Sequence, residues 1–421
     1  MLILETARNM GAWTYRMNIP GTPKCIVGHH DVTREIFMDK STDKPREIYG
    51  NLQGTKSKTM FTSSNADPYM KAIRKSTAHA FSSREVGRMN DVATKYVNEW
   101  LDGRLADLVK RQEPFDPAVE FNRITFKVIC EAAFEYMATD EEYEFFEHHA
   151  YWDLVEHALR QATNPIRKTL WFLFPEARKG RRSSDAILDF AGRVLDAYRR
   201  KPLEERSTNN TLIKILHDNE AILTEHQRKS EIKDWLVAGH DTTGYSLANM
   251  TVLVAKNLQV QDKLRREIAA SQSSPEAAVN NDYFKKVIKE TQRVMPTAAG
   301  GSIRITGRDF QIEETGEIIS KGTITFHNQY LMNHNQRVFG SDADEFRPER
   351  WDDPTDDMKA SSMPFAMGTR NCPGQSLALA EIYNTFPRLL TKYQLEVVEE
   401  GTKTYFLTLK YAGSKILAKN L

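Results

Sequence analysis

The sequence is poor in cysteine. Three cysteines stand in 421 residues, at Cys25, Cys130 and Cys372, and none has another close to it along the chain. Disulfide-stabilised secreted scaffolds carry cysteines far more densely, so this count predicts a reducing compartment. A disulfide bond is therefore a weak explanation for the presence of Cys372.

The chain also lacks an excess of charge of either sign. It has 58 Lys and Arg residues and 57 Asp and Glu residues, which gives a net charge of +1. A nucleic-acid partner or an acidic substrate usually leaves a basic excess, and none is present here. The composition therefore predicts no nucleic-acid binding.

No run approaches the roughly 20 apolar residues of a membrane-spanning helix. Four apolar residues open the chain and are followed by Glu5 and Arg8, which is too short for the apolar region of a signal peptide. The sequence as given predicts a soluble chain. Whether a longer product carries an anchor ahead of Met1 stays open.

Most of the chain shows the spacing of apolar residues that is typical of helices. Apolar residues recur at spacings of three and four over about 69–296 and again over 375–393, as on the buried face of a helix. The runs PKCIVG and TYFLTLKYAG each read as one strand. A long irregular segment is expected over 333–364. The predicted fold class is mainly α with small β-sheets (α+β), the sheets lying at about 15–60, 300–330 and 395–421.

One cysteine stands in an unusual frame, PFAMGTRNCPG, which spans Pro364–Gly374. A thiolate needs nearby positive charge or hydrogen-bond donors to stay ionised. Gly368 and Gly374 allow backbone turns that bring amide N–H groups towards the sulfur of Cys372. Arg370 adds a positive charge beside it. The frame suits a metal-ligating thiolate, although a buried structural cysteine or a redox thiol would also be compatible with it.

This frame resembles the haem-binding loop of the cytochrome P-450 family, F-x-x-G-x-R-x-C-x-G. Every fixed position is filled, by Phe365, Gly368, Arg370, Cys372 and Gly374. The resemblance implies haem b (iron protoporphyrin IX) with the Cys372 thiolate as the iron ligand and Phe365 covering the sulfur. It also implies a single cytochrome P-450 domain over 1–421, with the haem between a central helix and the helix that follows the cysteine loop.

A second family element is E-x-x-R, present as Glu290 and Arg293 in KETQR. Residues three apart on a helix share a face and can pair, although such pairs on a surface contribute little. The resemblance implies that this pair is buried and joined by Arg350 from FRPERW. Its implied role is structural, because the three together fix the loop that carries Cys372.

The family's oxygen-site motif appears in LVAGHDTTGYS, with Ala238, Gly239, Asp241 and Thr242 at its fixed positions. A mid-helix glycine is unfavourable, and the family context gives it a reason, because the missing side chain leaves room for dioxygen. Thr242 is expected to bond back to a carbonyl and hold a water, and Asp241 to feed protons into it. The alternative is a small-residue packing seam. His240 is interpreted as a neighbour rather than a ligand.

Two arginines match positions that contact the haem propionates in the family. Arg74 lies in YMKAIRKSTAHAFS and Arg304 in GGSIRIT. Met70 stands where a tryptophan is usual, which removes one expected hydrogen bond to the haem and leaves its replacement open. Each arginine could also be a solvated surface residue.

The implied activity is that of a monooxygenase that inserts one oxygen atom of O2 into an apolar substrate. Its electrons would come from NADPH through an NADPH–cytochrome reductase, which would dock on Lys71, Arg74 and Lys75 unless these form only a solvated face. Two alternatives are a haem-thiolate isomerase or dehydratase acting on a hydroperoxide, and a non-catalytic haem-binding protein. The presence of Asp241 and Thr242 argues against both.

An aromatic cluster, Trp171, Phe172 and Phe174, stands beside four basic residues. This make-up predicts a peripheral membrane contact, with core aromatics before a solvated helix as the alternative. Family analogy implies the cytoplasmic face of the endoplasmic reticulum if a longer product carries an N-terminal anchor. The small residues over 298–301 suggest room for a bulky substrate, whose identity the sequence leaves open. The implied pocket lining is 48–66, 150–175, 235–243, 296–303 and 411–414.

Overall fold

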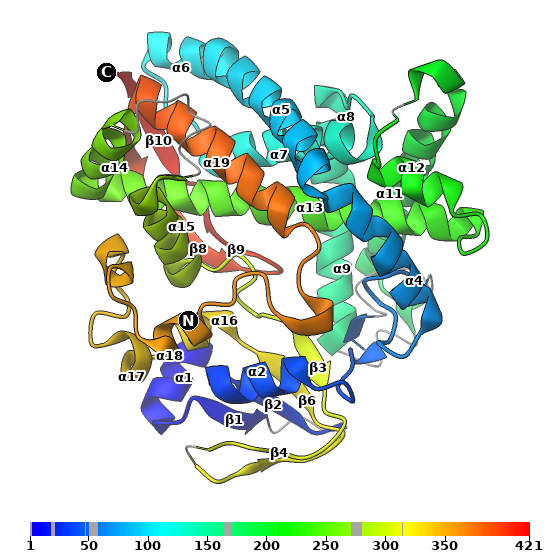
Figure 1. Cartoon of the computed structure of the whole chain (residues 1–421), viewed down its shortest axis with the longest axis vertical. Coiled ribbons are helices and arrows are strands. Elements are labelled where there is room, and N and C mark those ends of the chain that lie inside the picture. Colours follow the sequence, from blue (N-terminus) through cyan, green and yellow to red (C-terminus); the bar gives the residue numbers. More distant parts are fainter. Residues whose placement is uncertain are drawn as a thin grey trace.

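The structure is a computed structural model. It describes residues 2–17, 22–46, 48–49, 58–163, 170–206, 208–270, 280–313 and 315–421. A large helical body occupies the upper part of the molecule as drawn in Figure 1, and a smaller part built around a short sheet lies below it. The predicted class, mainly α with small sheets, is confirmed.

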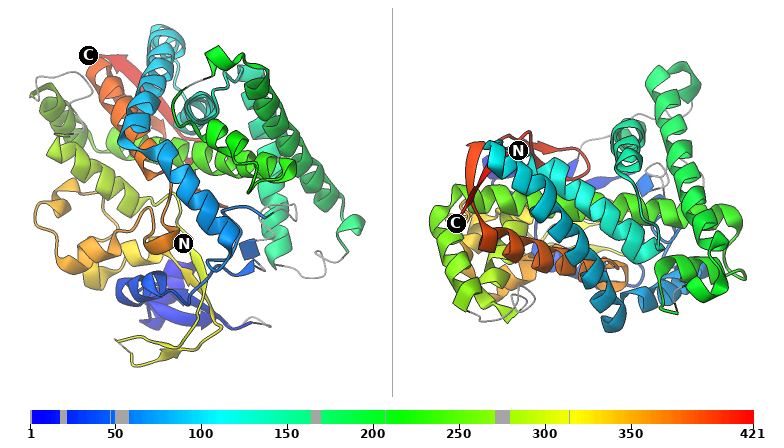
Figure 2. Two further views of the ribbon diagram at one scale, coloured as in Figure 1. Left: turned by 45° about the vertical axis from the view of Figure 1, so that its right-hand side comes forward. Right: turned by 90° about the horizontal axis from the view of Figure 1, so that it is seen from above.

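The helical body is built around α13, Glu225–Lys256, a helix of 32 residues. Thr224 caps its first turn in a capping box with Gln227, which fixes where the helix begins. Its buried residues are spread around the whole helix rather than along one stripe, as expected for a helix that other helices cover. It packs most extensively on α7, Pro117–Phe134. Figure 2 shows α5, Ser83–Trp100, and α19, Gln375–Lys392, crossing the same part of the molecule.

The remaining helices belong to this helical body and to the smaller part that holds the sheet. Their bounds are α1 Leu2–Met10, α2 His30–Met38, α4 Pro68–Thr77, α5 Ser83–Trp100, α6 Ala106–Arg111, α8 Asp140–Glu144, α9 Trp152–Thr163, α11 Pro175–Arg200, α12 Leu212–Asp218, α14 Leu258–Ala270, α15 Asp282–Val294, α16 Gln329–Asn333, α17 Gln336–Phe339, α18 Asp356–Ser361 and α19 Gln375–Lys392. Two π-helical turns join them, η2 Leu101–Leu105 and η3 Phe145–Tyr151. Short 3-10 turns are η1 Ala78–Phe81, η4 Trp171–Leu173, η5 Leu203–Glu205, η7 Pro348–Trp351 and η8 Gly368–Arg370.

The lower part holds a four-stranded sheet in the order β1-β2-β6-β3. Its strands are β1 Thr14–Met17, β2 Lys24–Val27, β6 Ile324–His327 and β3 Ile303–Ile305. The β2–β6 pair is parallel, with Lys24 opposite Ile324, while its two neighbours are antiparallel. Three two-stranded sheets are formed by β4 Phe310–Gln311 with β5 Ile318–Ile319, β7 Tyr393–Glu399 with β10 Lys415–Asn420, and β8 Thr402–Tyr405 with β9 Leu409–Ala412.

Several predicted elements are confirmed, and others differ. PKCIVG contains β2 as expected. TYFLTLKYAG is not one strand but parts of the two arms of the β8–β9 hairpin, in which Thr402 pairs with Ala412. The expected irregular segment 333–364 contains the short helices α17 and α18. Expectations that fall on 50–57 and 164–169 lie outside the described residues.

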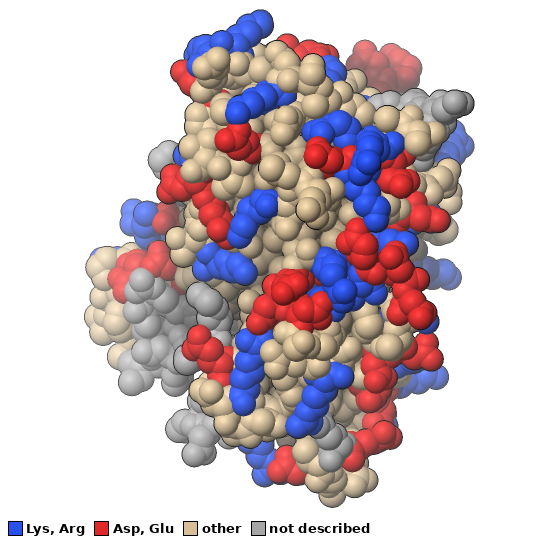
Figure 3. Space-filling view, turned by 90° about the vertical axis from the view of Figure 1, so that its left-hand side faces the viewer, with Lys and Arg blue, Asp and Glu red and all other residues tan. Residues whose placement is uncertain are grey.

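Among the described residues, no helix is both long enough and apolar enough to cross a membrane. On the face drawn in Figure 3, basic and acidic side chains alternate over the described surface. This mixture matches the balanced charge of the sequence. That face therefore carries no broad patch of one sign.

Candidate active site

The cysteine loop runs from Pro364 to Gly374 and leads directly into α19. Gly368 has a φ of +73°, and a Cβ there would lie 2.5 Å from the main-chain oxygen of Phe37 in α2. Only glycine fits this turn without displacing α2. Gly374 has an ordinary φ of −87°. The expected backbone need for glycine therefore holds at Gly368 and not at Gly374.

Cys372 differs from the other two cysteines in its exposure. Cys25 and Cys130 are buried and Cys372 is exposed. Its main-chain N–H donates to the carbonyl of Phe365 at 2.8 Å, which closes the loop around it. The side chain of Cys372 is accessible to solvent, but many protein atoms lie around it. This partial burial raises the pKa of the thiol, while the Gly374 N–H and the charge of Arg74 oppose that rise.

The two arginines predicted to contact the haem propionates come together with Arg370 around this loop. Arg74 in α4 donates to the carbonyl of Asn371 at 3.0 Å. Arg370 donates to the carbonyl of Met60 at 2.8 Å. Arg304 in β3 is buried, with its guanidinium 4.7 Å from the ring centroid of Phe37. Burial lowers the pKa of Arg370 to about 10, and the charge of Asp43 opposes this effect. The charges of Arg304 and Arg74 add to it, so the three arginines lie within electrostatic reach of one another.

Near the middle of α13 one side of the helix is open, although most of the residues around it are buried. Ala238 and Thr242 are exposed, and they stand four apart on the same side. The Thr242 hydroxyl donates to the carbonyl of Ala238 at 3.0 Å, as the sequence predicted. At Gly239 a Cβ would lie 2.0 Å from the Cδ1 of Ile129 in α7, which agrees with the alternative of a small-residue packing seam. Its missing side chain serves helix packing.

Asp241 lies on a different side of α13 and is almost completely buried. One carboxylate oxygen accepts from the Thr408 hydroxyl at 3.0 Å, and the Tyr151 hydroxyl also interacts with the carboxylate. Burial raises the pKa of Asp241, although the charge of His240 and the hydroxyl of Tyr151 counteract the effect. The carboxyl therefore keeps its proton to higher pH than an exposed aspartate.

A lysine shares this region. The Nζ of Lys410 in β9 lies 3.9 Å from the ring of Trp152 and 4.0 Å from the ring of Tyr245. Burial lowers its pKa to about 8, while Asp241 and Glu147 hold the charge in place. No local sequence pattern identified this lysine, because its partners come from three separate elements.

His240 has its own partner, Glu147 from the π-helical turn η3. Its Nδ1 lies 2.9 Å from the carbonyl of Leu236, which only accepts, so we assign the proton to Nδ1. Its Nε2 lies 3.3 Å from a carboxylate oxygen of Glu147. Burial disfavours the imidazolium, but Glu147 outweighs it and raises the pKa of His240 above 6.5. The same pair holds the pKa of Glu147 below 4.5 despite burial.

The His240–Glu147 pair predicts a pH-dependent coupling. The raised pKa of His240 stabilises the fold fully below pH 6.5, and this is lost as pH rises through the folded-state value. The lowered pKa of Glu147 stabilises it fully above pH 4.5, and this is lost as pH falls. A double-mutant cycle of His240→Gln and Glu147→Gln in urea should give a coupling of roughly 1–3 kcal/mol near pH 5.5. A coupling equally large near pH 9 would contradict the ion pair.

The E-x-x-R pair is buried as predicted. The guanidinium of Arg293 forms a bidentate ion pair with the Glu290 carboxylate, with N–O distances of 2.9 and 2.8 Å. Glu290 also accepts from the side chains of Arg350 and Trp351 and from the main-chain N–H of Arg347. Arg293 in addition donates to three main-chain carbonyls of the segment before the cysteine loop, those of Asn333, Ala343 and Glu345.

The small residues over 298–301 were expected to leave room for a substrate, and at the two glycines that expectation is wrong. A Cβ at Gly300 would lie 2.0 Å from the Tyr405 hydroxyl. Gly301 has a φ of +65°, and a Cβ there would lie 1.6 Å from the carbonyl oxygen of His327. Neighbouring protein atoms occupy both places. Of the four residues, Ala298 is exposed.

The predicted docking residues on α4 divide into two kinds. Lys71 and Lys75 are exposed, whereas Arg74 is half-buried and bonded to the cysteine loop. Beyond α4, Phe172 and Leu173 are exposed, with 50% and 60% of their surfaces accessible. Arg181 stacks on Trp171 at 3.7 Å, so this aromatic ring has a cationic partner within the chain.

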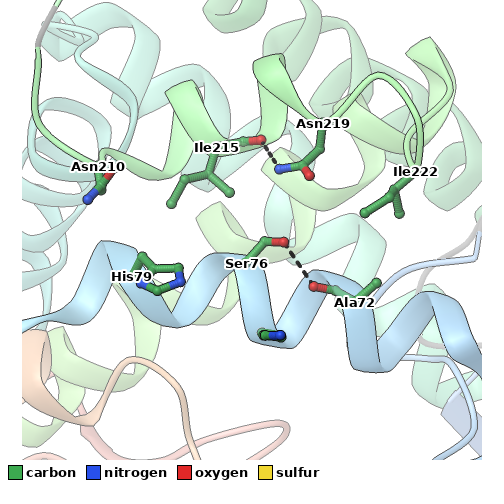
Figure 4. Close-up of a pocket in the computed structure, with 8 residues that line it drawn as sticks. Ala72, Ser76, His79, Asn210, Ile215, Asn219 and Ile222 are labelled. Carbon is green, nitrogen blue, oxygen red and sulfur yellow. Dashed lines mark hydrogen bonds between the residues drawn. The ribbon is translucent and has the colours of Figure 1, made fainter.

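A surface pocket of about 450 Å³ lies between α4 and α12 (Figure 4). Ser76 and Asn219 face it, and each bonds back to a carbonyl of its own helix. The predicted docking residue Lys75 lines this pocket, whereas none of the residues implied to hold the haem or the oxygen does. It is therefore separate from the cysteine loop and the open face of α13.

A model of the family described as Cytochrome P450 matches residues 5–416. The chain belongs to the cytochrome P450 family. The matched range includes all the P450 motifs described above, from Arg74 to the cysteine loop. Cys372, the buried Glu290–Arg293 pair and the open face of α13 therefore all lie within the part of the chain that matches the family.

Curated relatives match this P450 over parts of their length. The cytochrome P450 monooxygenase BOT4 of Botryotinia fuckeliana is 31% identical over 215 residues, 48% of this chain and 40% of the relative. The putative cytochrome P450 CYP13A8 of Caenorhabditis elegans is 33% identical over 182 residues, 42% of this chain and 35% of the relative. The chain thus spans less than half of these relatives. The cytochrome P450 monooxygenase traB of Penicillium crustosum is 27% identical over 78% of this chain and 67% of its own.

The fold has a counterpart among solved structures. The crystal structure of a cytochrome P450, CYP102L1, superposes with a TM-score of 0.80 and covers 100% of this chain and 98% of its own. The identity between the two is 20%, so this likeness establishes the P450 fold alone.

Proposed function

We propose that this P450 is a haem-thiolate monooxygenase that inserts one atom of O2 into an apolar substrate. The observation that carries the proposal is the exposure of Cys372, because the other two thiols are buried. The exposed Ala238 and Thr242 on α13 support it, since a covered helix has no packing reason to leave one face open.

The residues present fit a haem group. A haem carries two propionates, and the cysteine loop is surrounded by the positive charges of Arg74, Arg304 and Arg370. Buried like charges repel one another unless an anion joins them. These arginines would hold the propionates, and Cys372 would ligate the iron. Phe365 and Gly368 would keep the loop in shape around the sulfur.

A haem bound through a cysteine thiolate supplies activation of dioxygen with cleavage of the O–O bond. The chain's own part in this chemistry is to deliver protons and exclude water. Thr242 holds its hydroxyl at the open face of α13 by donating to Ala238. Asp241, whose pKa burial raises, holds a proton behind that face. Protons would pass from this carboxyl towards the Thr242 hydroxyl.

The electrons would come from NADPH through a reductase. Lys71 and Lys75 are exposed on α4, and Arg74 on the same helix contacts the cysteine loop. An acidic reductase face docked on these lysines would therefore lie one helix away from the thiolate. Arg74 contributes to the cofactor site rather than to the docking surface. The exposed Phe172 and Leu173 would make a peripheral contact with a membrane.

The first experiment is the Soret band of the purified protein after dithionite and carbon monoxide. We expect the far-red band peculiar to thiolate-ligated haem. A band at the imidazole position, or no haem after reconstitution, would contradict the proposal. NADPH consumption with an added reductase then separates a monooxygenase from a haem-thiolate isomerase or a non-catalytic haem protein, because neither of these uses NADPH.

A further inference from the structure

The segment 58–64, which leads into α4, is held from two sides through the main chain of one residue. The N–H of Met60 donates to the side-chain carboxyl group of Glu231 in α13 at 2.7 Å. The carbonyl of Met60 accepts from Arg370 in the cysteine loop at 2.8 Å. This segment therefore joins α13 to the cysteine loop by hydrogen bonds alone.

A second contact holds the same segment on α13. The hydroxyl of Thr59 donates to the carboxylate of Asp234 at 2.6 Å. Glu231 and Asp234 stand three apart on α13 and therefore share a face of the helix. Thr59 and Met60 are both buried, so water competes little for these bonds. Two neighbouring residues of the segment are thus bound to two acidic side chains of one helix.

Glu231 is an unusual partner because its side chain is almost completely buried, with 1% of the residue's surface accessible. The oxygen that accepts from Met60 also accepts from the Tyr69 hydroxyl in α4, at 2.7 Å. Burial raises the pKa of Glu231 to about 8, and the charge of Asp234 adds to the rise, while the Tyr69 hydroxyl and the Met60 N–H oppose it. The buried carboxyl group therefore keeps its proton at neutral pH.

The charged groups around this contact do not offer Glu231 a cation. Its nearest charge is Asp234 on the same helix, and Tyr69 in α4 is itself acted on by Asp67, the residue that caps α4. Lys44 lies within electrostatic reach of Asp234, whose charge opposes the lowering of the lysine's pKa. Among the described residues, none forms an ion pair with Glu231. An ionised Glu231 would therefore be a buried, uncompensated charge.

From this geometry we infer that Glu231 is a proton-operated latch for the segment 58–64. With its proton, the carboxyl group holds the segment on α13. Loss of the proton favours a state in which the segment has moved away and the carboxylate is hydrated. The inference goes beyond the proposed function, because these contacts lie within the chain and require no cofactor. Since the segment falls within the implied pocket lining over 48–66, the latch controls access to the pocket from this side.

The direction of the pH effect follows from the two states of the carboxyl group. In the latched state its pKa is about 8, and when hydrated it returns to the ordinary value of 4.5. Protons therefore bind more tightly to the latched state. The latched state is favoured fully below pH 4.5, and this preference falls by up to about tenfold for each pH unit until pH 8, above which it changes no further.

The test is hydrogen exchange of the main-chain N–H groups over 59–64 in the purified protein, measured by mass spectrometry and corrected for the pH dependence of exchange itself. In the unaltered chain we expect protection to fall roughly tenfold to a hundredfold between pH 6 and pH 8. In Glu231→Gln it should stay constant, because the amide oxygen can still accept from Met60 and Tyr69 but has no proton to lose. Glu220→Gln, at an exposed glutamate, is the matched control and should follow the unaltered chain.

Tyr69→Phe separates a latch from a contact that is only structural. The Tyr69 hydroxyl opposes the rise in the pKa of Glu231, so its removal should raise that pKa further. The fall in protection over 59–64 should then extend to higher pH than in the unaltered chain. A structural contact would lose protection equally at every pH.

Two results would overturn the inference. One is protection over 59–64 that does not change with pH in the unaltered chain, and the other is an equal fall with pH in Glu231→Gln. Neither result bears on the haem-thiolate proposal, which the Soret band tests separately. A missing far-red band would in turn leave the latch intact, because the exchange measurement requires no haem.

Discussion

Replacing Cys372 by serine is expected to abolish the far-red Soret band of the carbon monoxide complex. A serine hydroxyl is far less acidic than a thiol and cannot supply the thiolate that gives this band. The change is nearly isosteric, and the Cys372 N–H keeps its bond to the Phe365 carbonyl. The fold should therefore survive, and turnover of NADPH to product should fall below detection.

The matched controls are Cys25→Ala and Cys130→Ala. Both thiols are buried, and burial raises their pKa values, that of Cys25 to about 12. We expect both variants to keep the far-red band, with only the loss of stability that a small cavity produces. A band that disappears in Cys130→Ala and persists in Cys372→Ser would contradict the assigned ligand.

Arg293→Met is expected to be the most destabilising substitution at this site. Arg293 and Glu290 are both completely buried, and removing the arginine leaves the carboxylate with a weakened set of donors. Breaking such a pair costs about 3–5 kcal/mol. The three carbonyls that Arg293 contacts would also lose their donor. Urea unfolding monitored by tryptophan fluorescence measures the loss.

Arg308→Met is the control for this prediction. Arg308 also contacts two carboxylates, those of Glu35 and Asp39, at 2.7 and 2.6 Å. Its side chain is half-exposed, and ion pairs of that kind contribute little because water and salt screen them. The unfolding midpoint of Arg308→Met should stay close to that of the unaltered chain. Equal losses in the two arginine variants would mean that burial does not set the strength of the Glu290 pair.

Local motifs predicted the parts of the site that depend on backbone position. The cysteine loop, Thr242 and the Glu290–Arg293 pair are fixed by spacing on a turn or a helix, and spacing is visible in a sequence. The contact of Thr242 with the Ala238 carbonyl is of this kind, because it joins residues four apart.

Contacts between distant segments were not predictable in the same way. The small size of Gly300 and Gly301 predicted room for a substrate. In the structure, the Tyr405 hydroxyl and the His327 carbonyl fill the positions that side chains there would take. His240 and Glu147 are buried partners from separate elements, and no spacing rule joins them.

The parallel pairing of β2 with β6 has a consequence for how the chain is made. Lys24 can meet Ile324 only after most of the polypeptide has left the ribosome. Until then β2 has one unpaired edge, while the helices around α13 can form from contacts much nearer in sequence. We therefore expect the N-terminal strands to join the native structure late. In the interval, their exposed edge is the part of the nascent chain most in need of a chaperone.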